Sequence, residues 1–175
     1  MSTLKRMFSL WNFFLASLVL AGCGVYNFTG GDVGSAETFQ VNYFQNYATQ
    51  SPGSVFDPGL DRDFTLALQN LILTQTSLDL VTSGGDLVYE GEIVEYRVSP
   101  MTATAQQRAA QNRLTIAVNV RFYNNTKEEA NFEQRFSFFY DYPGTSQLAS
   151  VRDEAHQEIF ERINQEIFNR SLADW

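Results

Sequence analysis

Between Arg113 and Tyr123 the chain alternates between strongly apolar and mostly polar side chains. The apolar positions are Leu114, Ile116, Val118, Val120 and Phe122, and the intervening ones are Arg113, Thr115, Ala117, Asn119, Arg121 and Tyr123. A period of two places successive side chains on opposite faces of an extended strand. The segment therefore predicts a half-buried strand, and a chain that contains it must fold around a sheet with one apolar face.

Three other segments show strand patterns, at residues 37–45, 87–98 and 131–140. Within 87–98 the apolar residues change parity near Glu95, which indicates a β-bulge because one extra residue reverses the alternation. Gly84 and Gly85 precede this segment, and Pro143 and Gly144 follow the last one. Such residues are typical of turns. We therefore expect four strands.

Two segments have a helical period of three to four residues, at 60–76 and 146–173. Asp61 and Asp63 favour the start of the first helix, since carboxylates are stabilised near a helix N-terminus. Two amphipathic helices can cover only one face of a four-stranded sheet. We therefore predict an α+β fold, with two helices packed on one face of a four-stranded mixed sheet in the order β-α-β-β-β-α. The first strand is set apart by a helix, which allows it to pair parallel to one of the others.

Near the C-terminus, Phe168, Leu172 and Trp175 fall on a different side of the last helix from its main apolar stripe. Two interpretations stay open. An exposed apolar cluster at this place would mark a contact with a partner. Alternatively, this end of the helix is buried against the apolar residues between positions 25 and 28.

The N-terminal residues have the three parts of an export signal. Lys5 and Arg6 make a positive start, residues 7–20 are mostly apolar, and two small residues follow. The apolar run is shorter than the ~20 residues of a comfortable membrane span. Leu-Ala-Gly-Cys, which ends at Cys23, resembles a bacterial lipobox, in which the cysteine is acylated (by palmitate, for example) and cleavage occurs just before it.

The lipobox divides the chain into three parts. We predict a lipoprotein signal peptide over residues 1–22, a lipidated tether over 23–36 and a single α+β domain over 37–175. The alternatives are an ordinary signal peptide with a chance cysteine, or a short membrane anchor. Because Cys23 is the only cysteine, no disulfide is available and the fold depends on its core alone.

The charge balance bears on the class of partner. Without Lys5 and Arg6 the mature chain keeps 10 basic and 20 acidic residues, a net charge of −10. Binding to nucleic acid needs a basic surface, so we exclude a nucleic-acid partner. An anionic ligand would have to be met by a local cluster of arginines.

Groups that could carry out catalysis are scarce. There is no Gly-x-Ser-x-Gly turn, and His156, the only histidine, is expected to be a half-buried helix residue. A zinc site needs several His or Cys ligands. Asp57, Asp61 and Asp63 lack the spacing of a calcium loop, and we interpret them as helix-start acids. We therefore predict no enzyme activity, no cofactor and no metal site.

Arginines on the polar parity of the strands are the remaining candidate for a binding surface. They are Arg97, Arg113, Arg121 and Arg135, and Arg108 lies in a long loop at residues 99–112. Guanidinium groups suit bidentate binding of phosphate or carboxylate, so these five arginines are candidate contacts for an anion such as lipopolysaccharide. The alternative is cross-strand pairing with Glu92, Glu95 or Glu133.

A series of short motifs follows the lipobox in a defined order. They are Cys23-Gly24-Val25-Tyr26-x-Phe28, Leu87-x-Tyr89-x-Gly91-x-Ile93-x-x-Tyr96-x-Val98, Asn112-Arg113-Leu114-Thr115-Ile116-x-Val118, Phe132-Glu133-Gln134-x-Phe136-Ser137, and Ile167-Phe168-Asn169 ahead of Trp175. With these motifs nearly all of the mature chain resembles the LPS-assembly lipoprotein family, the LptE-like proteins. The fold of that family, two helices on one face of a four-stranded mixed sheet, agrees with the order of elements predicted above.

The resemblance implies a part in lipopolysaccharide transport. It implies a lipoprotein anchored in the outer membrane on the periplasmic side, acting as the plug and assembly subunit of a large barrel translocon (LptD-like). In this role it helps lipopolysaccharide reach the outer leaflet, without an enzymatic step. Of the family's functional residues, only the lipid-bearing Cys23 carries over to this chain. The alternative function is a periplasm-facing lipoprotein that binds an amphipathic anionic ligand without a barrel partner.

Overall fold

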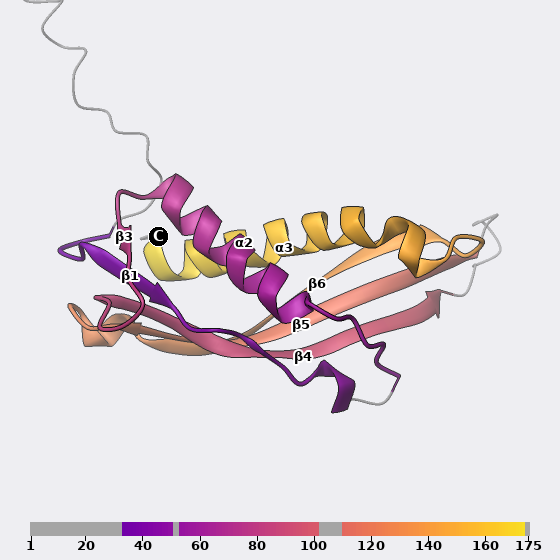
Figure 1. Cartoon of the computed structure of the whole chain (residues 1–175), viewed down its shortest axis with the longest axis horizontal. Helices are drawn as coiled ribbons and strands as arrows, with labels where there is room; N and C mark the ends of the chain where they lie inside the picture. Colours follow the sequence, from indigo (N-terminus) through magenta and orange to yellow (C-terminus); the bar gives the residue numbers. More distant parts are fainter. Residues whose placement is uncertain (1–32, 51–52, 102–109, 174–175) are drawn as a thin grey trace, which may run out of the picture.

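A computed structural model describes residues 33–50, 53–101, 110–173 of the chain. It contains one mixed sheet, with both helices packed on the same face (Figure 1). The α+β class, the two helices and the mixed sheet are therefore confirmed. Six strands form the sheet in the described residues, in the order β3-β1-β4-β5-β6 with β2 paired to β4, so the prediction of four strands is wrong.

Three long antiparallel strands make up most of the sheet: β4 (Leu87–Met101), β5 (Gln111–Asn124) and β6 (Phe132–Pro143). The predicted bulge is present, because the register between β4 and β5 shifts between Ile93 and Glu95. Each strand is longer than its pattern predicted. Pro143 lies on the last strand rather than in a turn, which is possible because β6 is at the edge of the sheet and a proline there removes no hydrogen bond to a further strand.

The predicted first strand is broken in two. β1 (Thr38–Val41) pairs parallel to β4 and to β3 (Asp79–Leu80), and β2 (Gln45–Asn46) pairs parallel to β4 farther along. The parallel pairing of the first strand with a later one is confirmed. Strands of two residues have no period to detect, which is why β2 and β3 did not appear in the pattern.

Gly91 explains where the first strand breaks. A side chain at Gly91 would overlap the carbonyl oxygen of Asn119 on β5 and approach the ring of Phe44 to 2.9 Å. The fully buried Phe44, between β1 and β2, thus packs into the space that Gly91 leaves free. The backbone N–H of Phe44 leaves the ladder and donates to the hydroxyl of Thr65 on the first helix, at 3.2 Å. The break therefore places an aromatic ring in the core.

Two α-helices cover the sheet, α2 (Leu60–Gln75) and α3 (Leu148–Leu172), and two short 3-10 helices, η1 (Ala48–Gln50) and η2 (Glu128–Ala130), lie in the connections. The apolar stripes of both helices are buried as predicted, α2 through Phe64, Leu68 and Ile72. A chain of aromatic rings joins the layers, since Phe64 lies 5.0 Å from Phe44 and 5.5 Å from Phe160 on α3, measured between centroids.

Of the two interpretations of the C-terminal apolar residues, the exposed cluster is wrong. Phe168 and Leu172 are 1% and 3% exposed, so they belong to the core and form no exposed cluster. The reason is that α3 packs against β5 and β6 on one side and against α2 on another, so two of its sides are covered. Trp175 and residues 25–28 lie outside the described residues. Of the helices described, none is both long enough and apolar enough to cross a membrane.

Candidate functional site

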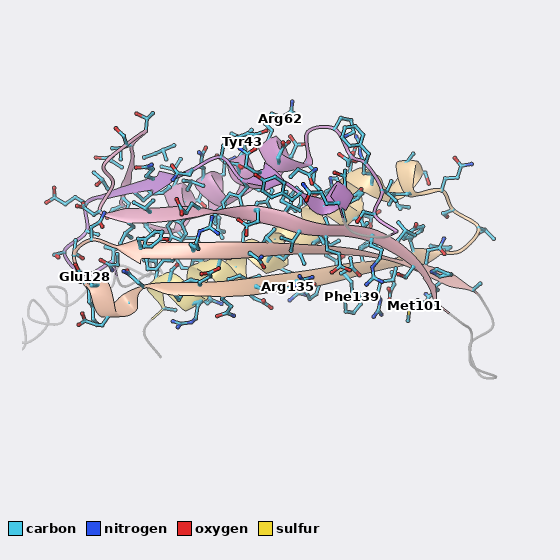
Figure 2. The ribbon with its side chains drawn as sticks, turned by 90° about the horizontal axis from the view of Figure 1, so that it is seen from below. Tyr43, Arg62, Met101, Glu128, Arg135 and Phe139 are labelled. Carbon is cyan, nitrogen blue, oxygen red and sulfur yellow. The ribbon has the colours of Figure 1, made fainter. Side chains whose placement is uncertain are left out.

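The face of the sheet opposite the helices carries the predicted arginines. Figure 2 looks onto this face, with Arg135 and Phe139 labelled on β6. We call it the open sheet face, defined by the outward side chains of β4, β5 and β6: Glu90, Glu92, Glu95, Arg97, Arg113, Asn119, Arg121, Glu133, Arg135, Phe139 and Asp141. Arg108 and Cys23 lie outside the described residues.

Arg113 on β5 is held by its neighbour on β6. It donates two hydrogen bonds to the carboxylate of Asp141, at 2.7 and 2.8 Å, and its guanidinium lies 3.5 Å from the centre of the Phe139 ring. The hydrogen bond raises the pKa of Arg113 and lowers the pKa of Asp141. The register of β5 and β6 places the two residues directly opposite each other, so alternation and register together produce the pair.

Arg121 pairs in the other direction, with β4. It donates to Glu90 and to Glu92 at 3.1 Å each, and Glu92 also accepts a hydrogen bond from Asn119. Hydrogen bonding to Glu90 is the main cause that raises the pKa of Arg121. Glu90 was not among the partners expected from the sequence, although it is the residue directly opposite Arg121.

Glu95 is shared by two arginines. Arg97 on the same strand and Arg135 on β6 approach its carboxylate to 2.7 and 2.6 Å. The bulge beside Glu95 lets residues 95 and 97 both face outward with Arg135. Arg97 and Arg135 remain about half exposed, with 48% and 51% of their side-chain surface accessible, whereas Glu95 is 15% exposed.

Four arginines are thus brought onto one face, each paired with at least one carboxylate. The partners are Glu90, Glu92, Glu95 and Asp141, so the face is close to charge balance. This geometry is the cross-strand pairing that we gave as the alternative to an anion site. An anion would have to compete with these carboxylates, and the two half-exposed arginines around Glu95 are the most accessible to it.

A second polar cluster is buried between the helices and β4. The hydroxyl of Tyr96 lies 3.0 Å from Nε2 of His156 and donates to Asp57 at 3.5 Å, and Arg152 approaches Asp57 to 3.7 Å. Burial lowers the pKa of His156 and raises the pKa of Tyr96. Their exposures are 8% and 1%, so the pair is enclosed and joins α3 to β4.

The position of Asp57 in the structure differs from the one expected from the sequence. The sequence pattern predicts a helix-start acid at this position, as at Asp61 and Asp63, and those two do lie in the first turn of α2. Asp57 instead is 7% exposed and faces Tyr96 and Arg152. Its partners are 39 and 95 positions away in the chain, so no local pattern could have revealed the contact.

A cavity of about 920 Å³ lies at one end of the molecule, and none of the four arginines of the open sheet face lines it. Its walls come from the start of the described chain, the turn between β5 and β6, and the last turns of α3. Lys127 and Arg170 line it together with Glu129 and Glu166, so its charges also balance.

Comparison with known proteins identifies the family. A family model described as LptE, lipopolysaccharide-assembly, matches residues 36–171, which is nearly the whole described domain. The chain belongs to the LptE family. The resemblance found in the sequence motifs is confirmed, and with it a role for this LptE-family chain in lipopolysaccharide assembly.

Several solved structures are similar to this LptE-family chain. A minor lipoprotein from Acinetobacter baumannii is 11% identical, covers 77% of this chain and 91% of its own, and has a TM-score of 0.48. Lipoprotein B from Nitrosomonas europaea is 14% identical, with coverages of 76% and 80% and a TM-score of 0.48. Rare lipoprotein B from Shewanella oneidensis is 13% identical, with coverages of 75% and 89% and a TM-score of 0.44. No curated protein matches the chain in sequence. The family model therefore carries the assignment.

Proposed function

We propose that this LptE-family chain is a lipid-anchored subunit of the lipopolysaccharide translocon in the outer membrane. In this proposal it faces the periplasm, plugs the lumen of an LptD-like barrel and supports the assembly of that barrel. The observation that carries the proposal is the match of the family model over residues 36–171. The proposed role includes no catalytic step, and the Tyr96–His156 pair is buried rather than displayed at the surface.

The proposed anchor is Cys23, acylated after removal of residues 1–22. The support is the lipobox, since apolar run, small residues and cysteine coincide there. One acyl chain gives only marginal membrane binding, and stable anchoring takes a second signal. An anchor at Cys23 would hold the folded domain at the membrane surface where a barrel partner is found.

Copurification from outer membranes tests the plug. A C-terminally tagged chain, extracted in mild detergent, is expected to bring down one large barrel in near-equal amount. An unrelated tagged lipoprotein of the same membrane, purified in parallel, serves as the control. If the tagged chain never recovers a barrel that the control lacks, the proposal fails.

A second candidate is direct binding of lipopolysaccharide or another amphipathic anion at the arginines. The favouring observation is that Arg97 and Arg135 share one carboxylate and stay half exposed. Replacing both by glutamine should reduce the lipopolysaccharide retained by the purified protein while barrel recovery stays unchanged. Unchanged retention would exclude this site.

A further inference from the structure

The two helices lie on the same face of the sheet but expose different chemistry to solvent (Figure 1). α3 carries eight charged residues along its length: Arg152, Asp153, Glu154, Glu158, Glu161, Arg162, Glu166 and Arg170. α2 carries charges only in its first turn, at Asp61, Arg62 and Asp63, and none from Phe64 to its end. Its outward side instead includes Leu66 and Leu73, which are 48% and 43% exposed.

These two leucines lie on one side of α2. They are seven residues apart, which is two helical turns or about 10 Å along the axis. Tyr43, which is 50% exposed, lies beside the charged first turn of the helix, at Asp61 and Arg62 (Figure 2). Figure 2 shows Tyr43 beside Arg62, which lies one turn ahead of Leu66. We call Leu66 and Leu73, which lie beyond the charged first turn, the neutral stripe.

A single exposed leucine needs no explanation. A helix that faces water, however, normally has charged and polar side chains on its outer side, as α3 has. Beyond its first turn α2 has none of the charges that would keep such a side in water, although the chain as a whole has 32 charged residues. The lack of charge therefore belongs to this side of the molecule in particular, which is what a covered surface requires.

We propose that the neutral stripe of α2 docks on an uncharged patch of apolar and aromatic side chains on the protein partner that encloses this chain. This inference rests on the proposed function and names the surface through which the barrel is contacted. The charged outer side of α3 then faces water or solvated polar groups. An uncharged patch matches the stripe because neither side has to give up the hydration of a charge.

Two other occupants fit the stripe less well. Helices that lie on a membrane surface carry Lys and Arg on their polar side, whereas the only basic residue of α2, Arg62, is paired with Asp63 at 2.8 Å. A second copy of the chain would gain little, because two half-exposed side chains fall well below the roughly 800 Å² per partner of a stable pair. The stripe suits a partner that also holds the chain through other surfaces.

Photo-crosslinking in intact outer membranes tests the contact directly. p-Benzoylphenylalanine is placed at position 66 or 73 of the full chain, and at position 157 or 161 on the outer side of α3 as matched controls. We expect positions 66 and 73 to crosslink to the barrel and the α3 positions to do so weakly. Crosslinks from positions 66 and 73 to a second copy or to lipid, or no crosslink at all, would overturn the inference.

Charge insertion tests whether the stripe matters for binding. The double variant Leu66→Glu/Leu73→Glu should recover about tenfold less barrel than the wild type, which corresponds to about 1.4 kcal/mol of binding. Ser150→Glu/Gln157→Glu is the matched control, with the same spacing on exposed positions of α3, and should recover barrel normally. The thermal unfolding midpoints of both variants are measured to confirm that they fold. If Leu66→Glu/Leu73→Glu does not fold, the crosslinking experiment alone tests the inference.

The two proposals fail in different ways. If the wild-type chain recovers no barrel, the proposed function fails. If the wild type recovers the barrel and Leu66→Glu/Leu73→Glu recovers it equally well, the plug remains and only the docking surface is wrong.

Discussion

At the scale of single residues, Gly91 is the described glycine with the least room for a side chain. An alanine Cβ would overlap the carbonyl oxygen of Asn119 and displace the ring of Phe44. We expect Gly91→Ala to lower the free energy of unfolding by about 3 kcal/mol, the upper range for overpacking. Urea unfolding of the wild type and the variant measures this difference in free energy. Gly84→Ala is the control, because Gly84 has a φ of +70° but open space around it, and should cost about 1 kcal/mol. Equal effects of the two would contradict the role of Gly91.

His156 gives a prediction about pH. Its pKa is lowered by burial, so it stays neutral in the folded chain at pH values where the unfolded chain is already protonated. As the pH falls below about 6.5, the unfolded state takes up a proton that the folded state does not, and the free energy of unfolding decreases. The slope is at most about 1.4 kcal/mol per pH unit.

The measurement compares urea unfolding of the wild type and of His156→Gln between pH 7.5 and 5.5. Glutamine keeps a hydrogen-bonding group near Tyr96 but does not titrate, so the variant should lose this part of the pH dependence. Parallel curves for the two proteins would show that His156 does not contribute.

At the scale of elements, Phe64 holds the layers together. Its ring contacts Phe44 from the broken first strand and Phe160 from α3. Phe64→Ala removes both contacts and leaves a cavity, which should cost about 3–5 kcal/mol of unfolding free energy. Leu66→Ala, two positions on at an exposed site, should stay within about 0.5 kcal/mol. Thermal or urea unfolding measures both variants. Similar stability of Phe64→Ala and Leu66→Ala would contradict the role of Phe64 in holding the layers together.

At the scale of the whole molecule, the anchor decides where the domain acts. We expect mature protein extracted from membranes to begin at Cys23 and to carry acyl groups, seen as extra intact mass. Cys23→Ser should abolish the extra mass and release the protein from the outer-membrane fraction. An unmodified thiol at this position in the mature wild-type chain would contradict the anchor and the plug that depends on it.

Much of this architecture could be predicted from local patterns. Alternation located β4, β5 and β6, the parity change at Glu95 located the bulge, and the helical period located α2 and α3, because each pattern repeats over ten residues or more. The short strands β2 and β3 could not be found in this way. β2 exists because the edge of β4 offers free hydrogen-bonding groups to the segment that passes it, and β3 because the outer edge of β1 does the same. Phe44 determines where the chain between β1 and β2 breaks.

The sequence by itself determined the class of fold, the acidic character, the lipobox and the family motifs, since these depend on residue type and spacing along the chain. Only the tertiary structure decided the partners of the arginines, the burial of Asp57 with Tyr96 and His156, and the exposure of the uncharged part of α2 beyond its first turn. The physical reason is that charge pairing and exposure are set by neighbours across strands and helices. Those neighbours are chosen by register and packing, which no single segment encodes.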